Sequence, residues 1–314
     1  MIAKMADAGV GGRTDEYAAY ATLLTTNRDD ITSVVVTAFG TSAGADLDPI
    51  LSDENEFVAA YIVGALSHNS AKSAAAFTNL TNGFAPRFAD FISVRTHASS
   101  GSLKQLATDL VTQIKGVVDD AAAKGYPKLF ADMRSAALPA SRLADALATS
   151  IAGQFPDKFP GSLTDPAVDA RVGVSLLLHE HAYLTTMATS ALIGARSTEQ
   201  AAAQTALAAN GAALGTALEA RTQLGPIWDA KDASMLTYAG SSDAAKRQAA
   251  REQLTGAYVA QLAGLIPGVA DAATLQVEAS IRVVDDQRSN ATSKVADDDR
   301  AAAAAMQPLA DLMT

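Results

Sequence analysis

Gly11-Gly12-Arg13-Thr14-Asp15-Glu16 returns later in the chain, in altered form, as Gly194-Ala195-Arg196-Ser197-Thr198-Glu199. Other matches follow in unchanged order, while the distance along the chain between matched positions falls steadily. Loop deletions in a second copy produce such a falling distance, and chance does not. The matched pairs are Leu24 with Leu207, Asn27 with Asn210, Pro49-Ile50-Leu51 with Pro226-Ile227-Trp228, Ile92 with Ile266, Val117-Val118-Asp119-Asp120 with Val283-Val284-Asp285-Asp286, and Leu143-Ala144-Asp145 with Leu309-Ala310-Asp311.

The composition indicates helix throughout. Of the 314 residues 49% are hydrophobic, but only 5% are aromatic, and alanine supplies much of the difference. Alanine is the best helix former and lets helices pack closely, while alternating β-branched residues are scarce. The sequence therefore predicts an all-α fold of two tandem divergent antiparallel helical-bundle repeats.

The expected domains are a first helical bundle over 1–153, a linker over 154–164 and a second bundle over 165–314. The linker begins Gln154-Phe155-Pro156-Asp157-Lys158-Phe159-Pro160-Gly161, whose prolines and glycine interrupt any helical period. Phe155 and Phe159 are expected to pack against a bundle. The pattern predicts helices near 15–39, 50–66, 70–92, 102–123 and 126–152, and then near 166–193, 198–220, 228–238, 243–266, 272–289 and 295–313.

Individual helix ends carry their own signals. Asp165-Pro166 is typical of an N-cap followed by proline in the first turn. Ser197 with Gln200 predicts a capping box, and Gly225-Pro226 predicts a chain break before the next helix.

The two opening helices differ in length. The second copy opens with a long helix over 166–193, whereas the matching part of the first copy is only Met1 to Val10. The first bundle thus has an apparently truncated opening helix. Either the sequence is incomplete upstream, or a helix from another molecule fills the gap.

The charge balance limits the classes of partner. With 24 basic and 34 acidic residues, the formal net charge is −10. This charge disfavours nucleic-acid binding. No stretch is apolar for long enough to predict a membrane span. The absence of cysteine excludes disulfides and thiolate metal sites. The run Asp297-Asp298-Asp299 is interpreted as a solvated helix end rather than a calcium loop.

His179 and His181 form the most conspicuous cluster, in Leu178-His179-Glu180-His181-Ala182-Tyr183. Residues two apart on a helix point about 200° away from each other, so these two histidines cannot bind one metal ion. One is expected to face the core and the other to face solvent or another helix. A hydrogen-bonded packing histidine is the simplest interpretation, but His181 with Met187 and Tyr183 also leaves a haem or copper ligand open.

Several short motifs resemble those of the uncharacterised secreted or surface-attached all-α repeat proteins of Gram-positive and related bacteria. Those proteins carry a Leu-Leu-x-Glu-His helix, a Gly-Gly-Arg turn, a Leu-Trp helix start and a terminal Gln-Phe-Pro-Asp-Lys-Phe. The corresponding residues here are Glu180-His181 within Leu176-Leu177-Leu178-His179-Glu180-His181, then Gly11-Gly12-Arg13, Ile227-Trp228 and Gln154 to Phe159.

The resemblance implies an extracellular or cell-surface location and no known activity. It also implies that several helices of the relatives carry a histidine, in places that hold Asp132, Lys231 and Gln276 in this chain. His181 alone stays in register. A histidine-lined metal or haem site in relatives would therefore be lost here.

Three functional hypotheses remain. The first is a non-enzymatic extracellular structural or interaction protein, with no cofactor, that associates with copies of itself into a filament or surface layer. The second is a haem- or copper-binding carrier with its ligand between helices near His181. The third is an enzyme that uses Asp and Glu side chains on facing helices, although no catalytic motif such as Gly-x-Ser-x-Gly is present.

Overall fold

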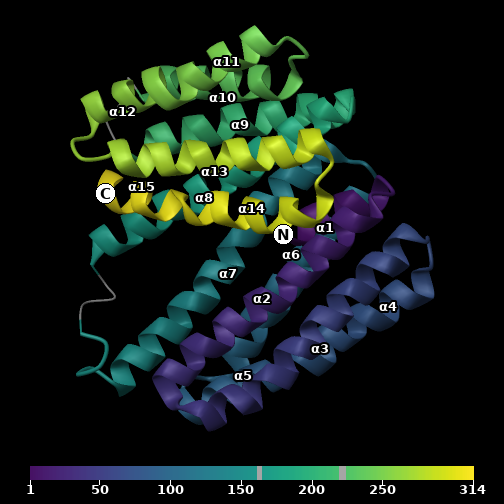
Figure 1. Ribbon diagram of the computed structural model, residues 1–314. Helices are drawn as coiled ribbons and strands as arrows, with labels where there is room; N and C mark the ends of the chain where they lie inside the picture. Colours follow the sequence, from purple (N-terminus) through teal and green to yellow (C-terminus); the bar gives the residue numbers. More distant parts are fainter. Residues whose placement is uncertain (161–164, 219–223) are drawn as a thin grey trace. The chain divides into compact units, whose positions relative to one another are not determined.

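The computed structural model describes residues 1–160, 165–218 and 224–314, and every regular element in these ranges is helical (Figure 1). The all-α prediction is confirmed. The chain divides into two compact units, Met1–Leu163 (unit 1) and Thr164–Thr314 (unit 2). None of the described helices is long and apolar enough to cross a membrane.

Unit 1 begins with the nine-residue helix α1, which contacts α2, α3 and α6. The π-helical segment η1 continues directly from α4 into α5, so these three elements form one helix with a π turn inside it. The elements are α1 (Ile2–Val10), α2 (Thr14–Phe39), α3 (Thr41–Leu66), α4 (Ser70–Thr78), η1 (Asn79–Phe84), α5 (Ala85–Thr96), α6 (Ser100–Ala122) and α7 (Tyr126–Gln154).

Unit 2 is built around its opening helix α8, which contacts α9, α10, α13, α14 and α15. Asp165 caps α8 by accepting a hydrogen bond from the Ala167 amide, and Pro166 opens its first turn, as the sequence predicts. The elements are α8 (Pro166–Ile193), α9 (Ser197–Ala217), α10 (Leu224–Gly240), α11 (Ala244–Glu252), η2 (Gln253–Tyr258), α12 (Val259–Leu265), α13 (Ala270–Ser289), α14 (Thr292–Ala304) and α15 (Met306–Met313).

Three predictions about where helices begin are wrong. Helix α3 begins at Thr41 and holds Pro49 in its interior. Leu47 is fully buried and Gly44 packs against α2. This packing outweighs the helical hydrogen bond that is lost because Pro49 has no backbone N–H. Helix α10 begins at Leu224, since proline is tolerated in a first turn and Pro226 causes no break. The N-cap of α9 is Arg196, so Ser197 forms no capping box.

Three other expected helices are interrupted. Those expected over 70–92 and 243–266 contain the π segments η1 and η2, and the one expected over 295–313 is divided at Ala305. Residues 219–220 of the helix expected over 198–220, and 161–164 of the expected linker, lie outside the described residues. Phe155 packs edge-on against Phe39 with ring centroids 5.6 Å apart, so its expected packing is confirmed.

The turn after the opening helix has the same local structure in both units. In unit 1 the Arg13 Nε donates to Glu16 at 2.7 Å, and in unit 2 the Arg196 Nε donates to Glu199 at 2.6 Å. The preceding residues Gly12 and Ala195 both adopt a left-handed conformation, with φ of 67° and 54°.

A second shared feature joins the third and sixth α-helices of each unit. The Tyr61 hydroxyl of α3 donates to Asp119 of α6 at 2.6 Å, and the Tyr238 hydroxyl of α10 donates to Asp285 of α13 at 2.7 Å. Helices α6 and α13 are each followed by a left-handed residue, Lys124 with φ of 55° and Asn290 with φ of 56°. Both units also contain a six-residue π segment, η1 and η2.

Candidate functional site

His181 lies in the interior of unit 2 and is fully buried. Its Nδ1 is 3.0 Å from the Trp228 Nε1 and 3.1 Å from the Asn210 Oδ1. Its Nε2 is 3.0 Å from Asp232 Oδ1 and 2.9 Å from the Lys231 Nζ. His181 is therefore a hydrogen-bonded packing histidine, and both of its ring nitrogens are engaged.

The donors around the ring determine its tautomer. An indole nitrogen only donates, so Nδ1 accepts from Trp228 and the ring proton lies on Nε2, which donates to Asp232. The Asn210 amide nitrogen donates to the Leu177 carbonyl at 2.9 Å and to Glu180 at 3.0 Å. These two bonds fix the Asn210 amide, and in this tautomer its oxygen faces the unprotonated Nδ1 and accepts no hydrogen bond from it. Side chains from α8, α9 and α10 thus meet at one imidazole.

Burial controls the charges of this cluster. It lowers the pKa of Lys231, whose side chain is 1% exposed, and it lowers the pKa of His181. Burial pushes the pKa of Asp232 upward, but the nearby His181 and Lys231 outweigh this effect and the net pKa is lowered. Asp232 is therefore the ionised member, while the imidazole is neutral and the amine loses its proton more readily than an ordinary lysine.

Three buried polar atoms of unit 2 have no hydrogen-bond partner among the described residues. They are the Tyr258 hydroxyl, whose ring packs edge-on against Trp228, the Gln276 Oε1 and the Asp286 Oδ2. Buried polar atoms without partners lower stability, so the interior of unit 2 is not optimised for stability alone.

The other sequence candidates do not join His181 in one site. Met187 is buried but is one of many packing side chains. The pKa of Tyr183 is raised by burial and by the charge of Asp299. A haem or copper ion at His181 would have to displace an existing hydrogen bond. No group of three or more His, Asp or Glu side chains that could hold a metal ion occurs in the described residues.

Two interpretations of neighbouring residues can be compared directly with the structure. His179 is half-buried and contacts the Ser175 carbonyl at 2.7 Å, so the two histidines do face different surroundings, as expected. Asp299 is fully buried and accepts from the Thr186 hydroxyl at 2.6 Å. The interpretation of the Asp297-Asp298-Asp299 run as a solvated helix end is wrong for Asp299, because Thr186 supplies it with a buried donor.

Of the three residues that the sequence comparison singled out besides His181, Lys231 contacts His181 and Gln276 is buried in the same unit. Asp132 belongs to unit 1, where it pairs with Lys128 at 2.9 Å.

Glu54 lies at the same spacing from Pro49 and Tyr61 as Lys231 lies from Pro226 and Tyr238. The Glu54 side chain has no hydrogen-bond or ion-pair partner among the described residues and is half-buried. Burial raises its pKa to about 7.

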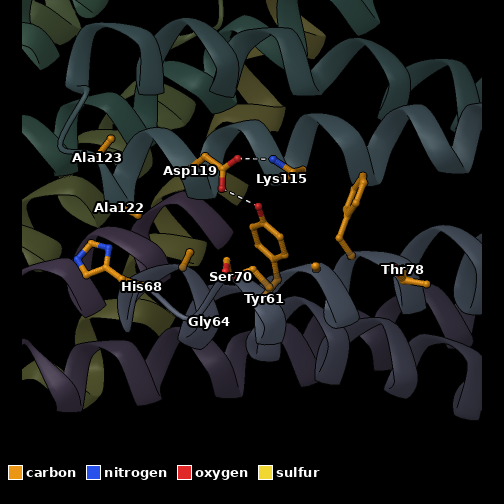
Figure 2. A pocket seen from close by; sticks show the side chains of 13 residues that line it. Tyr61, Gly64, His68, Ser70, Thr78, Lys115, Asp119, Ala122 and Ala123 are labelled. Carbon is orange, nitrogen blue, oxygen red and sulfur yellow. Dashed lines mark hydrogen bonds and ion pairs between the residues drawn. The ribbon is translucent and has the colours of Figure 1, made fainter.

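Unit 1 also contains a pocket of about 720 Å³ between α3, α4 and α6 (Figure 2). In Figure 2 Asp119 lies between Tyr61 and Lys115, and His68 lies at one end of the hollow. Burial, and then the bond to Asp119, raise the pKa of Tyr61 to about 12. The hollow exists because glycine, alanine and serine occupy most of its wall, among them Gly64, Ser73 and Ala122.

Reasoning from the sequence missed Glu54, the pocket and the contact between Lys231 and His181. The match of Asn27 with Asn210 was a usable signal for the His181 cluster, since the Asn210 Oδ1 lies 3.1 Å from the His181 Nδ1. With the geometry described, comparison with known proteins adds no relative: no family model, no curated protein and no solved structure matches this chain.

Proposed function

We propose that units 1 and 2 are divergent copies of one helical module. The shared arginine turn, the shared tyrosine–aspartate bond, the two π segments and the left-handed residues after α6 and α13 support this proposal. They recur in the same register as the sequence motifs.

The copies differ in the burial of one apolar position on their second helix. In unit 2, Leu214 of α9 belongs to the core cluster and is 1% exposed. The position that matches Leu214 in unit 1 is Ile31, and Ile31 is 38% exposed. One apolar position that is buried in unit 2 is therefore exposed in unit 1.

From this difference we infer that the protein is a non-enzymatic interaction protein that associates with copies of itself. The observation that carries this proposal is Glu54, a half-buried carboxylate without a partner in the described part of unit 1, where unit 2 has a closed His181–Lys231–Asp232 network. A carboxylate in that environment is stabilised when a partner supplies a cation or a donor.

Two surfaces are proposed to meet between copies. The receiving face consists of Ile31 and Val34 of α2, with Val34 being 64% exposed, and Glu54 lies on the neighbouring helix α3. The inserting stripe consists of Val172, Leu176 and His179 of α8, which lie at helical spacing on one face. Val172 and Leu176 are each 37% exposed.

The contact between these surfaces is heterologous, because a receiving face on one copy meets an inserting stripe on the next. Each bound copy still offers both surfaces at its ends, so association continues into chains unless the rotation closes a ring. The extracellular or cell-surface location remains a prediction that agrees with such an assembly. The alternative of a haem or copper carrier has no comparable support, since both nitrogens of His181 are engaged.

Two blocking variants test the proposal together. Val34→Glu places a charge on the receiving face, and Leu176→Glu places one on the inserting stripe. Each variant alone is expected to be monomeric in sedimentation velocity, while the wild type forms larger species. An equimolar mixture of the two is expected to stop at the dimer, because one intact contact remains.

The matched control is Leu275→Glu, which changes another exposed apolar residue, 49% exposed, outside both surfaces. This variant is expected to associate like the wild type, and electron microscopy of both is expected to show the same particles. Wild-type protein that stays monomeric at high concentration, or a mixture of blocked variants that forms no dimer, contradicts the proposal.

A further inference from the structure

The pocket in Figure 2 lies in unit 1, and larger side chains occupy the corresponding positions of unit 2. On the proposed correspondence between the units, α4 matches α11 and α6 matches α13. The helix caps Asn69 and Asp243 align the first pair, and the tyrosine-bonded carboxylates Asp119 and Asp285 align the second.

Three arginines of unit 2 stand where unit 1 has smaller or apolar pocket residues. Ser73 corresponds to Arg247, Phe77 to Arg251 and Ala122 to Arg288. The Arg247 Nη1 donates to the Ser242 carbonyl at 2.9 Å and to the Ser241 carbonyl at 3.1 Å. The Arg288 Nη1 donates to carbonyls at the end of α10, and to that of Ser241 at 3.2 Å.

Unit 2 thus fills this space with guanidinium groups, which lie against the negative end of α10. In unit 1 the end of α3 faces the same hollow, and its last turn holds no basic residue. The Tyr61 and Phe77 rings form one wall, with centroids 6.3 Å apart. Such rings present faces that attract cations.

The charged or titratable side chains that line the pocket, besides Tyr61, are Lys115, Asp119 and His68. Lys115 lies on α6 and pairs with Asp119 one turn further along at 2.5 Å, so these two charges offset each other. The Lys115 amine also lies 5.8 Å from the centroids of the Tyr61 and Phe77 rings, so this wall already accepts one cation. The charge of the preferred ligand then depends on the carbonyls at the end of α3 and on the faces of the Tyr61 and Phe77 rings. Both favour a cation over an anion.

We propose that the unit 1 pocket binds a guanidinium group on a short aliphatic stem, such as an arginine side chain, in the space that Arg288 and Arg247 fill in unit 2. This inference uses the proposed correspondence between the units but does not depend on self-association.

The probe is n-butylguanidinium, titrated into the full-length protein by calorimetry and followed by NMR of the tyrosine rings. One saturable site is expected, with n-butanol and butyrate binding at least about tenfold more weakly, because both lack the charge-assisted donors.

Filling and opening the pocket give the decisive comparison. Ala122→Arg restores the unit 2 residue in unit 1 and is expected to abolish binding, with the helical circular dichroism unchanged. Replacing both Arg247 and Arg288 with alanine opens the matching space in unit 2 and is expected to raise the stoichiometry from one site to two. The proposal is overturned if Ala122→Arg binds the probe like the wild type, or if butyrate binds as tightly as n-butylguanidinium. Either result leaves the sedimentation test of self-association unaffected, so the two proposals fail separately.

Discussion

Replacing Glu54 with glutamine is expected to remove the part of the pH dependence of unit 1 stability that this carboxylate contributes. The pKa of Glu54 is raised from 4.5 to about 7 by burial. A raised pKa means that the folded state holds the proton more tightly than the unfolded state. The stability associated with this proton is complete below the unfolded pKa of 4.5, falls as the pH rises toward 7, and is absent above that value.

The size of the effect follows from the shift. Each pKa unit corresponds to about 1.4 kcal/mol, so the full shift gives about 3 kcal/mol. Because the side chain is partly exposed, solvent screening reduces the expected loss to about 2 kcal/mol. Glutamine keeps the shape and carries no charge, so Glu54→Gln is expected to be about 2 kcal/mol more stable than the wild type at about pH 8 and nearly equal to it at about pH 4.

The chain provides its own reporter for this measurement. The single tryptophan, Trp228, is in unit 2, so its fluorescence follows unit 2 during urea unfolding while circular dichroism follows both units. The difference between variant and wild type is expected in circular dichroism and not in the Trp228 transition. Dilute protein is used so that self-association does not contribute.

The matched control is Glu56→Gln, which removes an exposed carboxylate from the same helix. This variant is expected to keep the pH dependence of the wild type. The reasoning is refuted if wild-type unit 1 is equally stable at about pH 4 and about pH 8, or if Glu54→Gln and Glu56→Gln behave alike.

Three further outcomes are expected. His181→Ala is expected to lower the unfolding free energy of unit 2 by about 3–5 kcal/mol, because it leaves a cavity and removes the nitrogen that accepts the Trp228 indole hydrogen bond. The measurement is urea unfolding followed by Trp228 fluorescence. A loss below about 1 kcal/mol contradicts the network around His181. Gly64→Ala would place its new Cβ 2.7 Å from the Ser73 amide nitrogen, whereas Gly215→Ala has open space around it. The first is expected to cost about 1–3 kcal/mol in urea unfolding and the second to be neutral or stabilising, so equal effects would contradict the close approach of α3 and α4. Haem titration is expected to give identical spectra for wild type and His181→Ala, and a histidine-ligated Soret band that only the wild type shows would restore the carrier hypothesis.

The sequence predicts the helices well wherever local chemistry decides their ends. Asp165-Pro166 predicts the start of α8 and Gly194 its end, because a capping carboxylate, an N-terminal proline and a following glycine act within one turn. Pro49 and Pro226 mislead, since packing around a helix can outweigh a local proline signal.

The candidate site is harder to predict because its energetics are not local. The burial of Lys231 depends on which helices surround it, and its contact with His181 joins residues 50 positions apart. The hollow beside Tyr61 results from small residues on three helices, so no single motif shows it. The sequence does contain the ordered matches between its two halves. Pairing the helices by these matches draws attention to Glu54 and to the arginine positions.

The π segments η1 and η2 bear on the proposed duplication of the helical module. A π turn holds one residue more than an α-helix accommodates, and it arises when a residue is inserted into an existing helix. The extra residue rotates everything after it by about 100°. In unit 1 this rotation directs Phe88 and Ile92 inward. On the proposed duplication, a single insertion before the copying event accounts for both π segments. Deletion of one residue from either segment rotates the side chains that follow by about 100° and turns them out of the core.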